Sequence, residues 1–132
     1  MKIRIVLLFV IMSLSACVFN IGSPNPDKRV TSAIKLKATK DIFIATATTA
    51  KRLCEQGILS IDDCETAEIA YMEGKEALIS AKEIWDVLVG MDNMDIINEK
   101  FFINGEHVSY DDLIMSAVKF TAMIETIIRK AD

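Results

Sequence analysis

One line of residues between Ile61 and Val89 constrains the fold more than any other feature of this chain. Its members follow one another at alternating intervals of three and four positions, which is the heptad spacing of a helix that packs lengthwise against another helix. Small and large side chains alternate along the line, so a partner helix can approach closely between the large ones. Gly90 follows and predicts the end of the helix. The line consists of Cys64, Ala67, Tyr71, Gly74, Leu78, Ala81, Trp85 and Leu88.

Two further helices are predicted on either side of this one. Residues 28–56 carry an apolar face and precede Gly57, a typical C-terminal stop, although a strand between Ile42 and Ala50 is a weaker alternative. A third helix runs from Ser109 to about Lys130. The apolar positions are Leu36, Phe43, Ala47, Ala50 and Cys54 in the first helix and Leu113, Ala117, Phe120, Ile124 and Ile127 in the third.

Short local signals mark the helix starts and a turn. Ser60 and Ser109 can each cap a helix, with Asp63 and Asp112 three residues later in the position of a reciprocal capping side chain. Residues 101–103 and 106–108 flank Asn104-Gly105, a preferred pair for a tight hairpin turn. So short a hairpin must rest on the helices. The predicted fold is all-α: a three-helix bundle with a short β-hairpin before the last helix.

The first sixteen residues account for part of the high apolar content, which is 52% for the whole chain. Lys2 and Arg4 precede an eight-residue apolar run from Ile5 to Met12, which is too short to span a bilayer and is typical of a secretory signal. The sequence Leu14-Ser15-Ala16-Cys17 then resembles the lipobox of bacterial lipoproteins.

The lipoprotein resemblance implies a processing site and a location. Residues 1–16 would be a signal peptide cleaved between Ala16 and Cys17, and Cys17 would carry the lipid that anchors the protein to a membrane. A cleaved signal with a chance cysteine and an uncleaved anchor are the alternatives. Val18 in place of aspartate points to the outer membrane, facing the periplasm, in a Gram-negative host. Residues 17–27, with two prolines, are predicted to be the lipidated cysteine and a tether, and residues 28–132 the helical domain.

The remaining cysteines, Cys54 and Cys64, lie at the end of the first predicted helix and the start of the second. An antiparallel helical hairpin brings these turns together, and an exported protein is exposed to oxidising conditions, so a disulfide is predicted. Nine intervening residues differ from the Cys-x-x-Cys layout of redox pairs. A metal site is less favoured, because no further thiol or suitably spaced histidine completes it.

Charge separates along the chain. Residues 28–52 carry a net +6 and residues 55–112 a net −12, within an overall charge of −4 that argues against nucleic-acid binding. A basic helix beside an acidic one favours antiparallel pairing. The alternative is that the first helix presents its charge to a partner or to acidic lipid headgroups.

The sequence offers little material for catalysis. His107 is the only histidine and has no recognisable nucleophile motif around it. Asp92, Asn93 and Asp95 lack the glycine and glutamate spacing of a calcium loop. Met91 and Met94 are read as gap-filling residues rather than ligands of a soft metal. We expect no enzymatic activity, no cofactor and no small-molecule substrate; an enzyme would need a pocket lined by carboxylates.

These features predict a membrane-anchored envelope protein that binds another, unknown envelope protein. The helical hairpin also loosely resembles small helical lipoproteins of prophages and other mobile elements, which implies a role such as exclusion of phage or plasmid entry. The alternative is a structural or assembly lipoprotein, similar to the pilots of outer-membrane complexes. An exclusion factor would present a loop, such as Asn104 to Tyr110, whereas a pilot would hold a partner helix in a groove along Ala67, Gly74 and Ala81.

Overall fold

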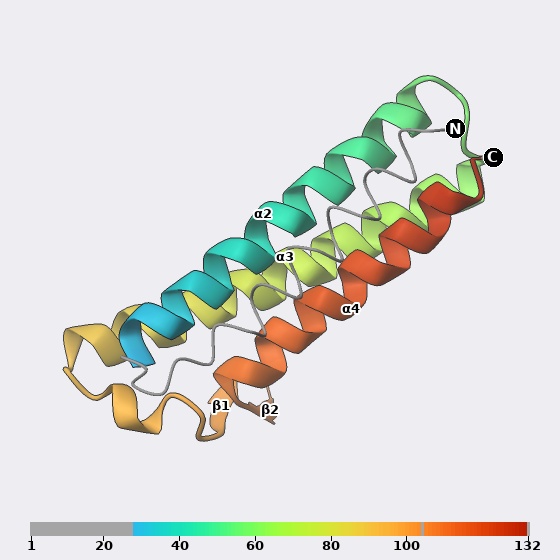
Figure 1. Cartoon of the computed structure of the whole chain (residues 1–132). Helices are drawn as coiled ribbons and strands as arrows, with labels where there is room; N and C mark the ends of the chain where they lie inside the picture. The colour runs from blue at the N-terminus through green and yellow to red at the C-terminus, as the bar shows by residue number, and fades with distance from the viewer. Residues whose placement is uncertain (1–27, 104, 132) are drawn as a thin grey trace.

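Three long helices lie side by side in the computed structural model, which describes residues 28–103 and 105–131 (Figure 1). Helix α2 (Lys28–Glu55) and helix α3 (Ile61–Gly90) form an antiparallel hairpin, and helix α4 (Tyr110–Arg129) returns beside them. The predicted three-helix bundle is confirmed. The predicted signal peptide, lipidated Cys17 and tether lie outside the described residues.

The turn between α2 and α3 forms as the glycine and serine signals predict. Gly57 adopts a left-handed φ of 70°, and the backbone N–H of Ile58 donates to the Leu53 carbonyl at 2.9 Å, which closes the end of α2 in a Schellman motif. Ser60 then caps α3 by accepting a hydrogen bond from the Asp63 N–H at 3.1 Å. The Asp63 carboxylate does not complete a capping box but pairs with Lys130 near the end of α4, at 3.1 Å.

The end of α3 lies slightly beyond the predicted position. The helix continues through Gly90, and the left-handed residue is Asp92, with φ of 52°. The N–H of Asn93 donates to the Leu88 carbonyl, so the same Schellman arrangement closes this helix without a glycine. Aspartate is one of the few residues other than glycine that tolerate the left-handed conformation. The left-handed residue that ends the helix is therefore Asp92, two positions after the predicted Gly90.

The short hairpin is confirmed and packs against the bundle, as its size requires. Strand β1 (Phe101–Ile103) pairs antiparallel with β2 (Glu106–Val108), with Ile103 opposite Glu106. Gly105 has φ of 84° in the turn. A single 3-10 turn, η1 (Met94–Ile96), precedes the hairpin. The side chains of Phe101 and Val108 pack against the buried cluster at this end of the bundle.

The start of α4 has the complete capping box. The Ser109 hydroxyl accepts from the Asp112 N–H at 3.0 Å, and the Asp112 carboxylate accepts from the Ser109 N–H at 2.9 Å. The Ser109 N–H that donates to it, then the Ser109 side chain, and to a smaller extent nearby Lys100, lower the pKa of the Asp112 carboxyl. The negative charge of this carboxylate also interacts favourably with the positive N-terminal end of the helix dipole, so it helps to fix where α4 begins.

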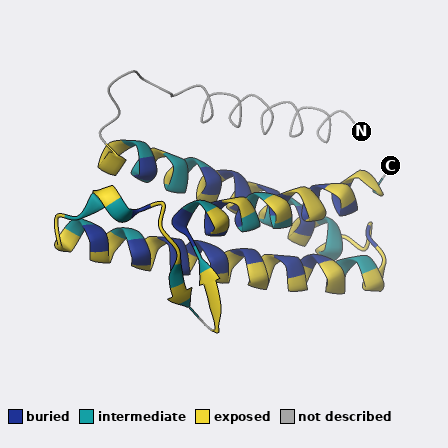
Figure 2. Ribbon diagram, turned by 90° about the horizontal axis from the view of Figure 1, so that it is seen from below, coloured by how far each residue is buried: buried dark blue, intermediate teal, exposed yellow. Residues whose placement is uncertain are grey.

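The core runs along the inner faces of the helices, where the buried residues gather in Figure 2. One cluster lies near the disulfide and includes Phe43, Ile124 and Ile128; the other lies near the hairpin and includes Tyr110 and Ile114. The predicted apolar positions of α2 and α4 all belong to these clusters or pack against them. The core also contains small polar residues that the apolar pattern missed, namely Ser32, Thr39, Thr46, Ser80 and Thr121.

Candidate functional site

The predicted groove along the small residues of α3 is filled by the chain's own side chains. Ala67 and Ala81 are buried, and Gly74 lies directly against the Phe43 ring of α2 and within reach of Phe120 of α4. A β-carbon added at Gly74 would overlap the Phe43 ring. At Gly74 and Ala81 the small residues therefore serve the bundle itself, so the expected groove for a partner helix does not run along this line; only Ala67 borders a hollow.

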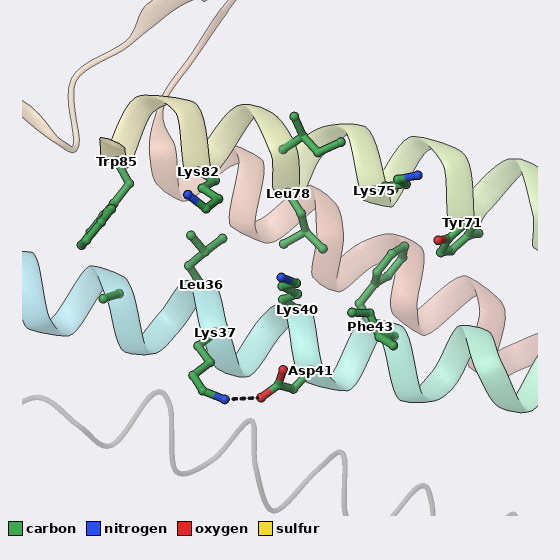
Figure 3. A pocket seen from close by; sticks show the side chains of 13 residues that line it. Leu36, Lys37, Lys40, Asp41, Phe43, Tyr71, Lys75, Leu78, Lys82 and Trp85 are labelled. Atoms are coloured by element: carbon green, nitrogen blue, oxygen red, sulfur yellow. Dashed lines mark hydrogen bonds and ion pairs between the residues drawn. The ribbon is translucent and has the colours of Figure 1, made fainter. Parts of the chain in front are cut away.

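A groove does lie on the neighbouring side of α3, between α3 and α2 (Figure 3). Its volume is about 550 Å³, which is in the usual range of binding clefts. Leu36 and Leu78 form an apolar floor. Toward solvent, the walls carry partly exposed side chains: Ile44 is 46% exposed, Ile79 49% and Tyr71 36%. The apolar side chains that line it are Ala33, Leu36, Phe43, Ile44, Tyr71, Leu78, Ile79 and Trp85.

Large side chains hold this groove open. The rings of Phe43 and Tyr71 stack across the two helices, with centroids 5.5 Å apart and planes 6° from parallel. Helix α3 packs less extensively against α2 than against α4. Beside the contact of Gly74 with Phe43, the large side chains of Tyr71 and Trp85 meet α2, and a cleft remains between the two helices.

One end of the groove is fixed by a hydrogen-bond network. Trp85 donates from Nε1 to the Ser32 hydroxyl at 2.8 Å, and the Tyr110 hydroxyl donates to the Ser32 carbonyl. Burial, followed by the charge of Asp111, raises the pKa of Tyr110 far above its usual range, so this phenol stays a hydrogen-bond donor. The network ties all three helices together at the wall formed by Trp85.

The groove continues toward the disulfide as a second hollow of about 610 Å³. Ile44 and Tyr71 belong to both hollows and mark the boundary between them. The predicted disulfide between Cys54 and Cys64 is present, with the α-carbons 5.9 Å apart, and both cysteines line the second hollow. It joins α2 to α3 at the closed end of their hairpin.

Lysines border the first hollow from both helices. Lys37 and Lys82 pair with carboxylates in their own helices, at 2.9 Å to Asp41 and at 2.7 Å to Asp86. Lys40 of α2 and Lys75 of α3 have no ion pair among the described residues. Both are exposed and line the hollow from opposite sides. At this hollow, therefore, the basic first helix does not face acidic residues of the second, as expected from the charge pattern; both helices contribute lysines.

The hairpin provides a second, smaller surface. Phe102 is 69% exposed, and its ring lies 5.0 Å from the ring of His107, which is also exposed. Of the predicted loop from Asn104 to Tyr110, Asn104 lies outside the described residues. Tyr110 is buried and belongs to the core, so it cannot take part in a presented loop.

The remaining candidate ligands are scattered. Within residues 28–103 and 105–131, no group of three or more His, Cys, Asp and Glu side chains is placed to hold a metal ion. Met94 packs against the core near the hairpin, whereas Met91 is exposed at the end of α3. None of the helices in the described part of the chain is long and apolar enough to cross a membrane.

Comparison with known proteins gives no match: no family model, no curated protein and no solved structure is similar to this chain. The groove itself combines an apolar floor with a lysine border. Such a surface suits an amphipathic ligand, one side of which is apolar and another negatively charged.

Proposed function

We propose that this protein is a lipid-anchored component of the bacterial cell envelope that binds another protein and has no catalytic activity. The lipobox-like sequence from Leu14 to Cys17 supports the anchor, with Cys17 as the lipidated residue after cleavage at Ala16. In a Gram-negative host the anchor would hold the helical domain on the outer membrane, facing the periplasm.

The α2–α3 groove is the observation that carries the binding proposal. Ile44, Tyr71 and Ile79 expose apolar surface around a hollow that the chain's own side chains do not fill. Concave apolar surfaces of this kind serve as anchoring sites for partner side chains. A groove between two helices suits a partner helix, which favours the structural or assembly role over exclusion.

Exclusion of phage or plasmid entry is the second candidate. It is supported by the hairpin, where Phe102 and His107 form an exposed aromatic pair that a passing protein can contact. The two roles therefore use different surfaces, and substitutions on each surface separate them.

The anchor is tested with Cys17→Ser in the full chain. We expect metabolic labelling with a fatty-acid analogue to mark the wild-type protein and to be lost in the variant, with the protein released from the membrane fraction. Cys54→Ser is the matched control and should leave labelling intact. Labelling that persists in Cys17→Ser would refute the anchor.

Binding is tested by affinity capture of the lipidated protein from envelope extracts, with variants of each surface. Ile44→Asp with Ile79→Asp should release a partner held in the groove, whereas Phe102→Ser should not. Loss of the partner only with Phe102→Ser would favour exclusion. Capture of the same proteins by wild type and by both variants would contradict binding at either surface.

A further inference from the structure

The two halves of the α2–α3 groove differ in charge. The half near Trp85 is lined by four lysines, Lys37, Lys40, Lys75 and Lys82, against a single carboxylate, Asp41. The half near the disulfide is lined by one lysine, Lys51, against Glu55 and Glu68. The groove therefore has a positive half and a weakly negative half along the same apolar floor.

Lys40 and Lys75 leave two positive charges of this half unpaired among the described residues. They extend from opposite helices beside Leu78 and Phe43 and have no carboxylate partner among the described residues (Figure 3). Two ammonium groups on opposite walls of an apolar hollow repel each other, and water is partly displaced once a ligand covers the floor. A carboxylate placed between them would relieve the repulsion and form charge-assisted hydrogen bonds.

We infer that the positive half binds an acidic amphipathic helix of a partner protein, an inference that rests on the proposed protein-binding function. The hollow follows α2 from Ala33 to Ile44, which at ~1.5 Å per residue is about 16 Å, or three helical turns. The apolar side of the bound helix lies on Leu36, Leu78 and Trp85. Its carboxylates lie between Lys40 and Lys75, and its neutral or basic end extends toward Glu68.

The charge pattern favours a helix over a lipid surface. An anionic membrane would meet the whole face at once, and Glu55 and Glu68 would oppose its headgroups over the second half of the groove. A helix can instead match the polarity with acidic residues at one end only. Ile44 and Ile79 on the two walls are about half exposed, so a helix can reach the hollow from solvent.

Site-specific photo-crosslinking in the producing bacterium tests this occupant. The full chain carries p-benzoylphenylalanine in place of Ile44, or in place of Met115 on α4, a control of similar exposure (46% and 53%). Mass spectrometry of the crosslinked product from the Ile44 position should identify one segment, helical in pattern, with acidic residues on one side. A lipid adduct, a second copy of this chain, a segment without carboxylates, or a yield no higher than from Met115 would overturn the inference.

A charge-reversal pair tests the role of the lysines. Lys40→Glu with Lys75→Glu should lower the crosslink yield from Ile44 at least about tenfold, because attraction becomes repulsion at the same two positions. The matched control is Lys28→Glu with Lys119→Glu, which changes the net charge equally at exposed sites outside the groove. Thermal melts of both variants show whether the bundle is intact. An equal loss in both pairs would refute a specific contact.

A third crosslinking position, Phe102, separates failure of this inference from failure of the proposed function. A protein captured from Phe102 but not from Ile44 would leave the binding function standing at the hairpin and would overturn the groove inference. Capture from neither position would overturn both.

Discussion

The two sides of α3 are built differently, although they belong to the same helix. Toward α4, Ala77, Ala81 and Ile84 lie in one buried cluster with Leu113 and Ile114, and the two helices pack extensively. Toward α2, the corresponding line consists of Tyr71, Leu78 and Trp85 with lysines between them, and a hollow remains. Small residues let helices close together, whereas large and charged residues hold them apart, so one side supplies stability and the other an accessible surface.

The largest expected contrast comes from truncating one isoleucine on each side. Ile114 of α4 is buried in the cluster that α3 and α4 share, so Ile114→Ala should lower the free energy of unfolding by about 2–5 kcal/mol. Ile79 is 49% exposed on the groove wall, and Ile79→Ala should change it by less than about 0.5 kcal/mol. Urea unfolding of both variants measures the difference. Equal losses would mean that the groove wall is part of the core.

Removing the disulfide tests how far α2 depends on it. Cys54→Ala with Cys64→Ala should destabilise the protein by about 3 kcal/mol, because the unfolded chain loses the constraint of a short closed loop. Amide hydrogen exchange should become faster mainly in α2 and α3, because these two helices form the least extensively packed pair. The increase in α4 should be smaller. Reduction of the wild-type protein should reproduce the effect. Faster exchange confined to α4 would contradict the comparison.

Gly74 tests the close approach of α3 to Phe43 of α2 and Phe120 of α4 within the core. Gly74→Ala places a β-carbon in steric overlap with the edge of the Phe43 ring and tightly against Phe120, and the forced shift should cost about 1–3 kcal/mol. Gly90→Ala is the matched control, because nothing lies within 4 Å of its added carbon. That change should be neutral or stabilising by up to about 1 kcal/mol, since alanine is the better helix former. A stabilised Gly74→Ala variant would show that Phe43 can move at no cost.

The smallest effect concerns acid stability at the start of α4. The pKa of Asp112 is lowered from 3.8 in the folded protein, so the unfolded chain takes up this proton first as the pH falls. The contribution is fully present above the unfolded-state pKa and is lost as the pH falls through the lower folded-state pKa. Unfolding measured from neutral pH to about pH 3 should therefore depend less on pH in Asp112→Asn than in wild type. Identical slopes would contradict the capping role of this carboxylate.

Local signals predicted most of the fold because they act over a few residues. Gly57, Ser60 and the Ser109–Asp112 capping box define helix ends through backbone hydrogen bonds, and the Asn-Gly pair selects the hairpin turn. The stop at Gly90 was misplaced because Asp92 adopts the left-handed conformation instead. Buried Thr46 and Ser32 were missed, since a search for apolar spacing passes over small polar side chains that fit between helices.

The candidate site was the part that sequence reasoning placed wrongly. The same heptad line contains the small residues that α2 and α4 cover and the large residues that border the groove, and spacing alone does not separate them. The expected groove at Gly74 is closed because the Phe43 ring packs there. Lys40 and Lys75 lie far apart in the sequence, so their positions on opposite walls of one hollow could not be read from it.

The sequence by itself determined three helices, their caps, the hairpin and the cysteine pair, because periodicity, turn chemistry and short loops are local properties. It also supplies the whole argument for the lipid anchor at Cys17. Only the tertiary structure decided which side of α3 is covered. That choice depends on how three helices share a limited set of small contact positions, and it leaves the lysine-lined hollow between α2 and α3 open.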